Sequence, residues 1–198
     1  TLLLCLSLWA CSTTPIRPPA ADPQQAWQQH HSMLTSLQQW QLFGRLAIQT
    51  GDEGWHASLN WMQHQQQYTI QLIAPLGQGT IQLQGDEQQV LLDTGDEQPI
   101  MATNPEVLLF QEFGWRVPVK SLRYWVLGLP APGESKHELD SYGRLSRLFQ
   151  NGWEIHFFDY ATTEQLELPG KIFINNHRAK VRLVVNRWEL APSVKDAG

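Results

Sequence analysis

The chain has 198 residues and a formal net charge of −5 at pH 7, and 17% of its residues are charged. This length is typical of one domain with a substantial core, and the negative charge excludes the broad basic field that nucleic-acid binding requires. Nine tryptophans are a high count for this length, and Trp side chains favour cores and boundaries between apolar and polar surroundings.

Residues 1–10, with the sequence TLLLCLSLWA, are mostly apolar. Such a run is too short to span a bilayer, which takes about 20 residues, but it is typical of the apolar segment of a secretory signal. No initiator Met and no basic segment precede it, so we expect the printed chain to begin inside a signal peptide. Cys5 would then be removed together with the signal.

The motif Leu8-Trp9-Ala10-Cys11 resembles a bacterial lipobox, which is cut before its cysteine. This interpretation predicts a diacylglycerol group and an N-acyl chain on Cys11, and each buried methylene would contribute about 0.8 kcal/mol to membrane attachment. Trp9 departs from the usual small residue, and the alternative is an ordinary signal peptide with an incidental cysteine. Ser12 replaces the Asp that retains lipoproteins at the inner membrane, a pattern that resembles outer-membrane sorting.

Residues 11–23 combine the predicted lipidated cysteine with a Pro-rich tether. A chain of this composition favours the extended polyproline II form, which rises about 3 Å per residue. We expect one domain at 24–190, followed by a flexible tail at 191–198.

Helical and then strand-like patterns follow the tether. Between Gln24 and Trp40, apolar residues recur at helical spacing and predict one amphipathic helix. Period-two alternation then predicts strands over the ranges 41–50, 55–64, 68–74, 79–84 and 88–94, separated by turns rich in Gly, Asp and Glu.

Two short helices interrupt the strands. The first is predicted at 104–114, with Asn104 as the N-cap and Gly114 at the end. The second begins near Pro118 and stops at Gly128. Strands resume over the ranges 143–150, 152–160, 168–175 and 178–190, and the pair Asn151-Gly152 is a strong signal for a type I′ hairpin turn.

These elements predict a mainly β protein with an antiparallel sheet of about ten or eleven strands and about three helices. The apolar face of the sheet must be buried by a second sheet, by closure into a barrel, or by helices. A curved sheet with helices in its mouth accommodates both kinds of element and leaves room for an apolar cavity. From periodicity alone, the candidates for lining it are Trp61, Leu72, Trp125, Trp153 and Phe157. The alternative is that these side chains pack a plain core.

Catalytic and metal-binding patterns are not found. The sequence has no Gly-x-Ser-x-Gly and no phosphate-binding loop, and the adjacent pair His30-His31 points to different sides of a helix. Acidic residues gather in predicted turns, where they are expected to be solvated and to have no catalytic role. His156 lies in a predicted strand, and no nucleophile is visible near it in the sequence. We therefore expect no enzyme activity, no metal and no cofactor beyond the lipid.

Leu76 stands between Pro75 and Gly77 at the tip of a predicted hairpin. Pro suits the second position of a type I turn and Gly the fourth, which places Leu76 at the corner. Either the loop folds back and docks Leu76 on the sheet edge, or the side chain is exposed. Exposure costs roughly 1.5–3 kcal/mol relative to burial, so an exposed Leu76 would need a use, such as contact with lipid or an acyl chain.

The sequence resembles the family of the outer-membrane lipoprotein LolB over nearly its whole length. The resemblance rests on Cys11 and the tether, and on four segments at 27–48, 74–84, 118–130 and 182–190, of which APLG and SLRYWVLGLP are the most specific. It implies an open antiparallel half-barrel whose concave face is covered by helices and whose hydrophobic cavity holds acyl chains. It also implies that Leu76, in the loop Pro75-Leu76-Gly77, protrudes and serves membrane insertion.

The resemblance implies a monomeric receptor on the periplasmic face of the outer membrane. Such a receptor takes client lipoproteins from the carrier LolA and inserts them into the inner leaflet of that membrane. Two other classes of function stay open at this point. One is a structural lipoprotein that serves as an interaction module of an envelope assembly machine, and the other is a periplasmic hydrolase with an unrecognised site.

Overall fold

The computed structural model describes residues 18–77, 79–95 and 98–190. The predicted signal segment 1–10, Cys11 and the predicted tail 191–198 lie outside the described residues. Within them the helices are α1 (Pro23–Thr35), α2 (Pro105–Phe113), α3 (Val119–Trp125) and the short 3₁₀ helix η1 (Pro75–Gly77). The strands are β1 (Gln39–Thr50), β2 (Glu53–His64), β3 (Gln67–Ile73), β4 (Thr80–Gly85), β5 (Val90–Asp93), β6 (Ile100–Ala102), β7 (Lys136–Leu139), β8 (Leu145–Gln150), β9 (Trp153–Phe158), β10 (Ala161–Thr163), β11 (Leu166–Leu168), β12 (Lys171–Asn175) and β13 (Ala179–Leu190).

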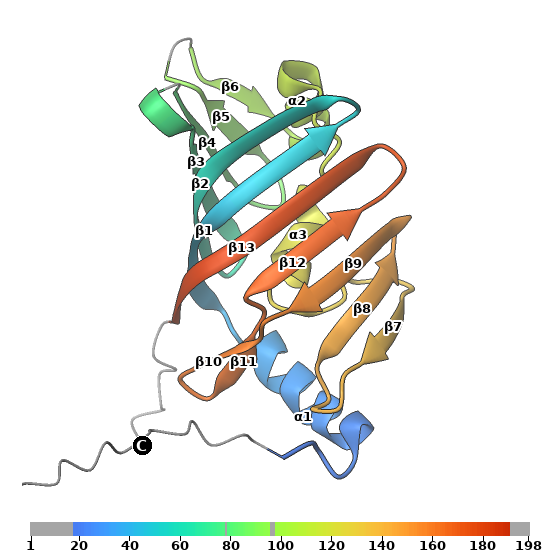
Figure 1. Ribbon diagram of the computed structural model, residues 1–198. Helices are drawn as coiled ribbons and strands as arrows, with labels where there is room; N and C mark the ends of the chain where they lie inside the picture. The colour runs from blue at the N-terminus through green and yellow to red at the C-terminus, as the bar shows by residue number, and fades with distance from the viewer. Residues whose placement is uncertain (1–17, 78, 96–97, 191–198) are drawn as a thin grey trace, which may run out of the picture.

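Eleven of these strands form one antiparallel sheet in the order β6-β5-β4-β3-β2-β1-β13-β12-β9-β8-β7. Strands β10 and β11 pair separately as a small hairpin. The sheet curves but does not close, because β6 and β7 lie at its two edges. Helices α2 and α3 lie on the inner side of the curve, and α1 covers one end beside β10 and β11 (Figure 1). The predicted open half-barrel is therefore confirmed.

The alternation of the strands decides which side chains enter the core. In β2, Ala57, Leu59 and Trp61 are buried, whereas Ser58 and Asn60 lie between them on the outer face. The same period of two runs through the other long strands, since successive side chains in a strand point to opposite faces. The core thus fills the space between the concave face and the helices, as the pattern predicts.

The first helix is shorter than the sequence predicts. Helix α1 ends at Thr35 instead of Trp40, and the chain enters β1 at Gln39. Trp40 pairs with Leu190 of β13, so the ladder hydrogen bonds of a long strand replace the last helical turn. The buried face of α1 also includes His30, whose Nε2 lies 2.8 Å from the carbonyl oxygen of Glu167.

The ends of α2 agree with the sequence. The Asn104 side chain accepts a hydrogen bond from the backbone N–H of Val107 at 3.0 Å, and Gly114 adopts the left-handed φ of 69°. Helix α3 ends at Trp125, earlier than the predicted Gly128, since the next residues form turns instead of a helix.

The predicted hairpin turn between β8 and β9 is confirmed. Asn151 and Gly152 have φ values of 52° and 77°, and a type I′ turn requires positive φ at both of its central residues.

A buried amide fixes the segment after α3 to the sheet. Gln150, at the end of β8, accepts hydrogen bonds from Trp125 Nε1 at 2.9 Å and from the N–H of Ala131 at 2.8 Å. Its own amide group donates to the Ala131 carbonyl at 2.7 Å. Only 3% of Gln150 is exposed, and unpaired polar groups at that depth are costly. The three bonds therefore hold the end of α3 in one position.

Candidate functional site

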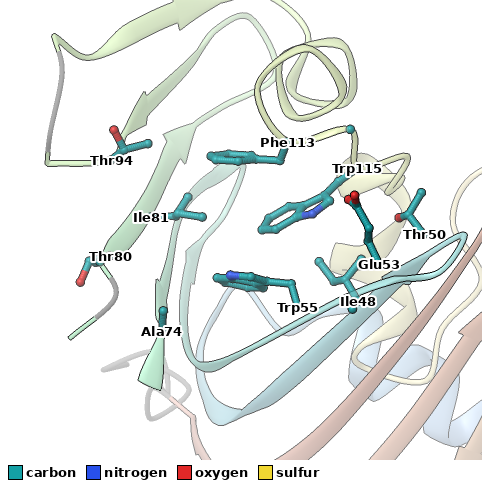
Figure 2. Close-up of a pocket in the computed structure, with 13 residues that line it drawn as sticks. Ile48, Thr50, Glu53, Trp55, Ala74, Thr80, Ile81, Thr94, Phe113 and Trp115 are labelled. Atoms are coloured by element: carbon teal, nitrogen blue, oxygen red, sulfur yellow. The ribbon is translucent and has the colours of Figure 1, made fainter. Parts of the chain in front are cut away.

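The candidate site is a pocket of about 700 Å³ where the end of α2 faces the inner side of β1 to β5 (Figure 2). Ligand pockets commonly have volumes of roughly 300–1,000 Å³. The side chains and glycines that line it are Ile48, Thr50, Glu53, Gly54, Trp55, Ala74, Gly79, Thr80, Ile81, Thr94, Phe113, Gly114 and Trp115.

One wall of the pocket is aromatic. The Trp55 and Trp115 rings lie 4.8 Å apart between centroids, and the Phe113 ring lies 4.7 Å from that of Trp115. The left-handed Gly114 that ends α2 lets the chain turn sharply between its two aromatic neighbours. The rings of Phe113, at the end of α2, and Trp115, just after it, consequently face the pocket, and the Trp55 ring faces it from β2 (Figure 2). This wall presents mostly apolar surface.

The rim of the pocket is polar. Thr50 and Glu53 lie on one side of the opening, and Thr80 and Thr94 lie on the other (Figure 2). The Thr50 hydroxyl is buried and has no hydrogen-bond partner in the described part of the chain. An apolar interior behind a polar rim suits a ligand with an apolar tail and a polar head.

The loop with Leu76 borders this pocket directly. Its two ends, Ala74 and Gly79, both line the pocket, and the Ala74 N–H donates to the Gly79 carbonyl at 3.1 Å. Between them Leu76 is 97% exposed, so the docked alternative is wrong. An apolar side chain therefore projects into solvent beside the pocket.

The backbone at Leu76 is not that of the predicted type I turn. Its φ and ψ are 57° and 28°, whereas the third residue of a type I turn has φ near −90°. The loop closes through the Ala74–Gly79 bond with a left-handed corner instead. A left-handed leucine costs roughly 1–2 kcal/mol, so both the exposure and the backbone of this residue are unfavourable to the isolated fold.

The five predicted lining candidates are all buried, but they lie elsewhere in the interior. None of them lines the pocket beside the Leu76 loop; Trp61 borders a separate pocket of about 350 Å³. Trp153 borders another separate pocket, of about 870 Å³, at the turn between β8 and β9, and its ring lies 6.5 Å from that of Trp125 between centroids. The full set of predicted lining candidates is Trp61, Leu72, Trp125, Trp153 and Phe157. Their contact with acyl chains stays a prediction.

Sequence reasoning missed the aromatic wall. Trp55 shares the predicted inner face of β2 with Trp61, so it had a signal in the alternation. Phe113 and Trp115 flank the predicted helix-ending glycine in the sequence FGW, a pattern that places two aromatic side chains at one helix end. The strands that face the end of this helix could not be inferred, because their position depends on the curvature of the sheet.

The described residues contain no metal-binding cluster, and His156 lies on the outer face of the sheet. No group of three His, Cys, Asp or Glu side chains there could hold a metal ion. His156 Nε2 lies 2.9 Å from Glu154 Oε1 on the outer face of the sheet. The pKa of Glu154 is lowered chiefly by its hydrogen bond with Arg147. None of the helices described in residues 18–190 is long and apolar enough to cross a membrane.

Comparison with known proteins identifies the family. Residues 38–188 match the family model described as outer membrane lipoprotein LolB. The chain belongs to the LolB family. An outer-membrane lipoprotein LolB from Nitrosococcus oceani is 44% identical over 191 residues, which cover 96% of this chain and 95% of that protein. The LolB of Alkalilimnicola ehrlichii is 38% identical, with the same coverage.

Solved structures with low sequence identity share the LolB-like fold. A LolA superfamily protein from Nitrosomonas europaea has a TM-score of 0.55 at 10% identity, and the match covers 88% of this chain and 96% of that one. A DUF1329 family protein from Desulfovibrio piger has a TM-score of 0.56 at 7% identity, with 89% and 97% covered. At these identities the likeness concerns the fold alone.

Proposed function

We propose that this LolB family member accepts acylated lipoproteins from the periplasmic carrier LolA and inserts them into the inner leaflet of the outer membrane, without catalysing a reaction. The pocket with the aromatic wall would take acyl chains, and its rim would face the polar protein part of the client. The observation that carries the proposal is Leu76, which is 97% exposed on a loop whose two ends line the pocket.

Transfer of acyl chains in this scheme needs no energy source. Each methylene that leaves water gains about 0.8 kcal/mol, so the chains move toward whichever site buries them best. A bilayer buries them completely, and it is the final acceptor. The protein supplies a dry path between carrier and membrane and an apolar side chain, Leu76, that enters the membrane surface.

We also propose that the molecule acts as a monomer held by lipid on Cys11 at the periplasmic face of the outer membrane. The domain at 24–190 would then act beside the membrane to which the tether at 11–23 attaches it. Mass spectrometry of the membrane fraction tests the anchor, because Cys11→Ser should remove the diacylglycerol and N-acyl groups together.

The decisive experiment is a transfer assay with a purified LolA–lipoprotein complex. The client should leave LolA for this protein in solution and should enter vesicles only when this protein is present. If the client stays on LolA, the receptor function is wrong, and the family resemblance then reflects a different role such as an interaction module.

The pocket itself is tested on strand β4. Ile81→Arg places a charge in the pocket lining and should abolish saturable binding of a fluorescent apolar probe, because contact with an apolar guest would remove water from the charged group. Gln84→Arg adds the same charge at an exposed position of the same strand and is the matched control. Equal binding by both variants, or no saturable binding by the parent, would place acyl chains elsewhere or indicate a plain core.

A further inference from the structure

Charge is divided unevenly along this chain. Residues 46–115, which include β2 to β6, η1 and α2, contain nine Asp and Glu and no Lys or Arg. The half of the sheet that carries Leu76 therefore has no cation with which to attract a negatively charged surface. The cations of the sheet all lie in β1 and in β7 to β13.

The seven cations of the sheet share its outer face, and we call this set the outer basic face. Strand alternation places them there: in β13, for example, Lys180 and Arg182 are exposed between the buried Ala179, Val181 and Leu183. Across the strands the set comprises Arg45, Lys136, Arg147, Lys171, Lys180, Arg182 and Arg187.

Most of the outer basic face has no internal counter-charge. Arg147, Lys171 and Arg187 each form an ion pair with a carboxylate on the same face. The cations with no carboxylate within 4.0 Å in the described part of the chain are Arg45, Lys136, Lys180 and Arg182.

Aromatic rings lie between the cations. Arg187 lies 4.1 Å from the centroid of Phe43, and Arg182 lies 5.4 Å from that of Phe173, its cross-strand partner. The Phe158 side chain, 41% exposed, packs against Phe173 with centroids 5.2 Å apart. The face thus carries separated cations with apolar rings between them.

We propose that the outer basic face docks on anionic phospholipid headgroups. Because the cations are spread over four or more strands about 4.8 Å apart, they match a plane of many phosphates better than a single buried anion. Lys and Arg side chains near an anionic membrane surface contribute favourably one by one, and exposed aromatic rings favour the interface itself.

This inference rests on the proposed function and deepens it, since it names the surface that brings the body to the membrane. The acidic half that carries Leu76 is repelled by anionic lipid. The outer basic face offsets that repulsion, so that Leu76 reaches the bilayer while the body is held at its surface.

The test uses the chain from Ser12 onward, which lacks the predicted signal and lipid site but keeps every core residue from Trp27 to Trp188. Binding is measured by flotation with phosphatidylcholine vesicles, with and without phosphatidylglycerol, in low and high salt. The face variant combines Arg45→Gln and Arg182→Gln. Its control combines Arg116→Gln and Lys120→Gln, which remove the same charge from exposed positions near the helices.

The parent and the control should bind vesicles with phosphatidylglycerol in low salt and release them in high salt. The face variant should bind about 30-fold more weakly, as expected for the loss of two cations. Equal losses in both variants would reduce the effect to net charge and overturn the proposal. Normal vesicle binding by the face variant would also overturn the proposal. If that variant binds vesicles normally but is defective in transfer from LolA, the face binds an acidic protein partner instead.

Thermal unfolding of both variants checks that the fold is kept. Uptake of client from LolA by the parent is measured in parallel. If uptake fails while vesicle binding behaves as expected, the proposed receptor function is wrong and the lipid-docking surface stands. If uptake succeeds while the face variant binds vesicles normally, the receptor function stands and the lipid-docking surface is wrong.

Discussion

Replacing Leu76 by Glu separates the fold of the protein from its action on the membrane. Because Leu76 is 97% exposed, the substitution removes almost no buried contact, and the free energy of unfolding should change by no more than about 0.5 kcal/mol. Uptake of client from LolA should also be retained. Delivery into vesicles should fail, because the side chain that enters the bilayer would be charged.

The size of the delivery defect follows from two transfer terms. Burial of a leucine side chain contributes about 1.5–3 kcal/mol, and a charged side chain in the hydrocarbon costs on the order of 3 kcal/mol. Their sum of roughly 5 kcal/mol corresponds to a rate lowered by about 1,000-fold or more, if the side chain is inserted at the rate-limiting step.

A graded series sharpens the test. Leu76→Gly suits the left-handed φ of 57° better than leucine does, and it loses only the leucine transfer term, so delivery should fall by roughly ten- to a hundredfold. Met101→Glu changes another exposed apolar side chain, 67% exposed on β6, and should deliver normally. Delivery by Leu76→Glu at the parent rate would refute the reasoning.

Three further variants test the packing that positions the site. Gln150→Leu leaves its buried partners unpaired and should destabilise the fold by about 3–5 kcal/mol in urea unfolding, while the exposed Gln84→Leu should change it by less than about 0.5 kcal/mol. Gly44→Ala should destabilise by about 2 kcal/mol or more, because the added Cβ would lie 2.5 Å from a backbone oxygen; Gly54→Ala meets nothing within 4 Å and should be neutral or slightly stabilising in thermal unfolding. The Tyr68 hydroxyl is buried without a partner among the described residues, and burial raises its pKa to about 12. Since the folded state favours the protonated hydroxyl, the raised pKa contributes to the free energy of unfolding below pH 10, and this contribution is lost as pH rises toward 12. Tyr68→Phe should weaken this alkaline loss of stability in unfolding curves without lowering stability at neutral pH.

Much of this architecture is encoded locally. Alternation placed nine of the strands, Asn104 and Gly114 marked the ends of α2, and Asn151-Gly152 marked a hairpin, because each signal depends on a few neighbouring residues. The short strands β6, β7, β10 and β11 were not predicted, since three or four residues are too few to show an alternation. The end of α1 was missed, since the pairing of Trp40 with Leu190 joins residues far apart in the sequence.

The site was harder to predict for the same reason. Aromatic residues on predicted inner faces all qualify for burial, and the sequence does not distinguish Trp61, which lies outside the candidate pocket, from Trp55 in its wall. That difference arises from where α2 lies across the curved sheet. The exposure of Leu76 likewise depends on a left-handed corner, which leucine rarely adopts and which a turn pattern does not predict.

The unclosed sheet has a mechanical consequence. A closed barrel has a circumference set by its strand number and stagger, so widening it requires breaking an inter-strand ladder. Here β6 and β7 are free edges, and the sheet can flatten or curl with every ladder intact. The resistance to such a change comes from the helices on the concave face, which are joined to it mainly by side-chain packing and by a few bonds such as those of Gln150. A change in the interior volume of this fold would therefore require α2 to move relative to the strands, but it would not require an inter-strand ladder to break.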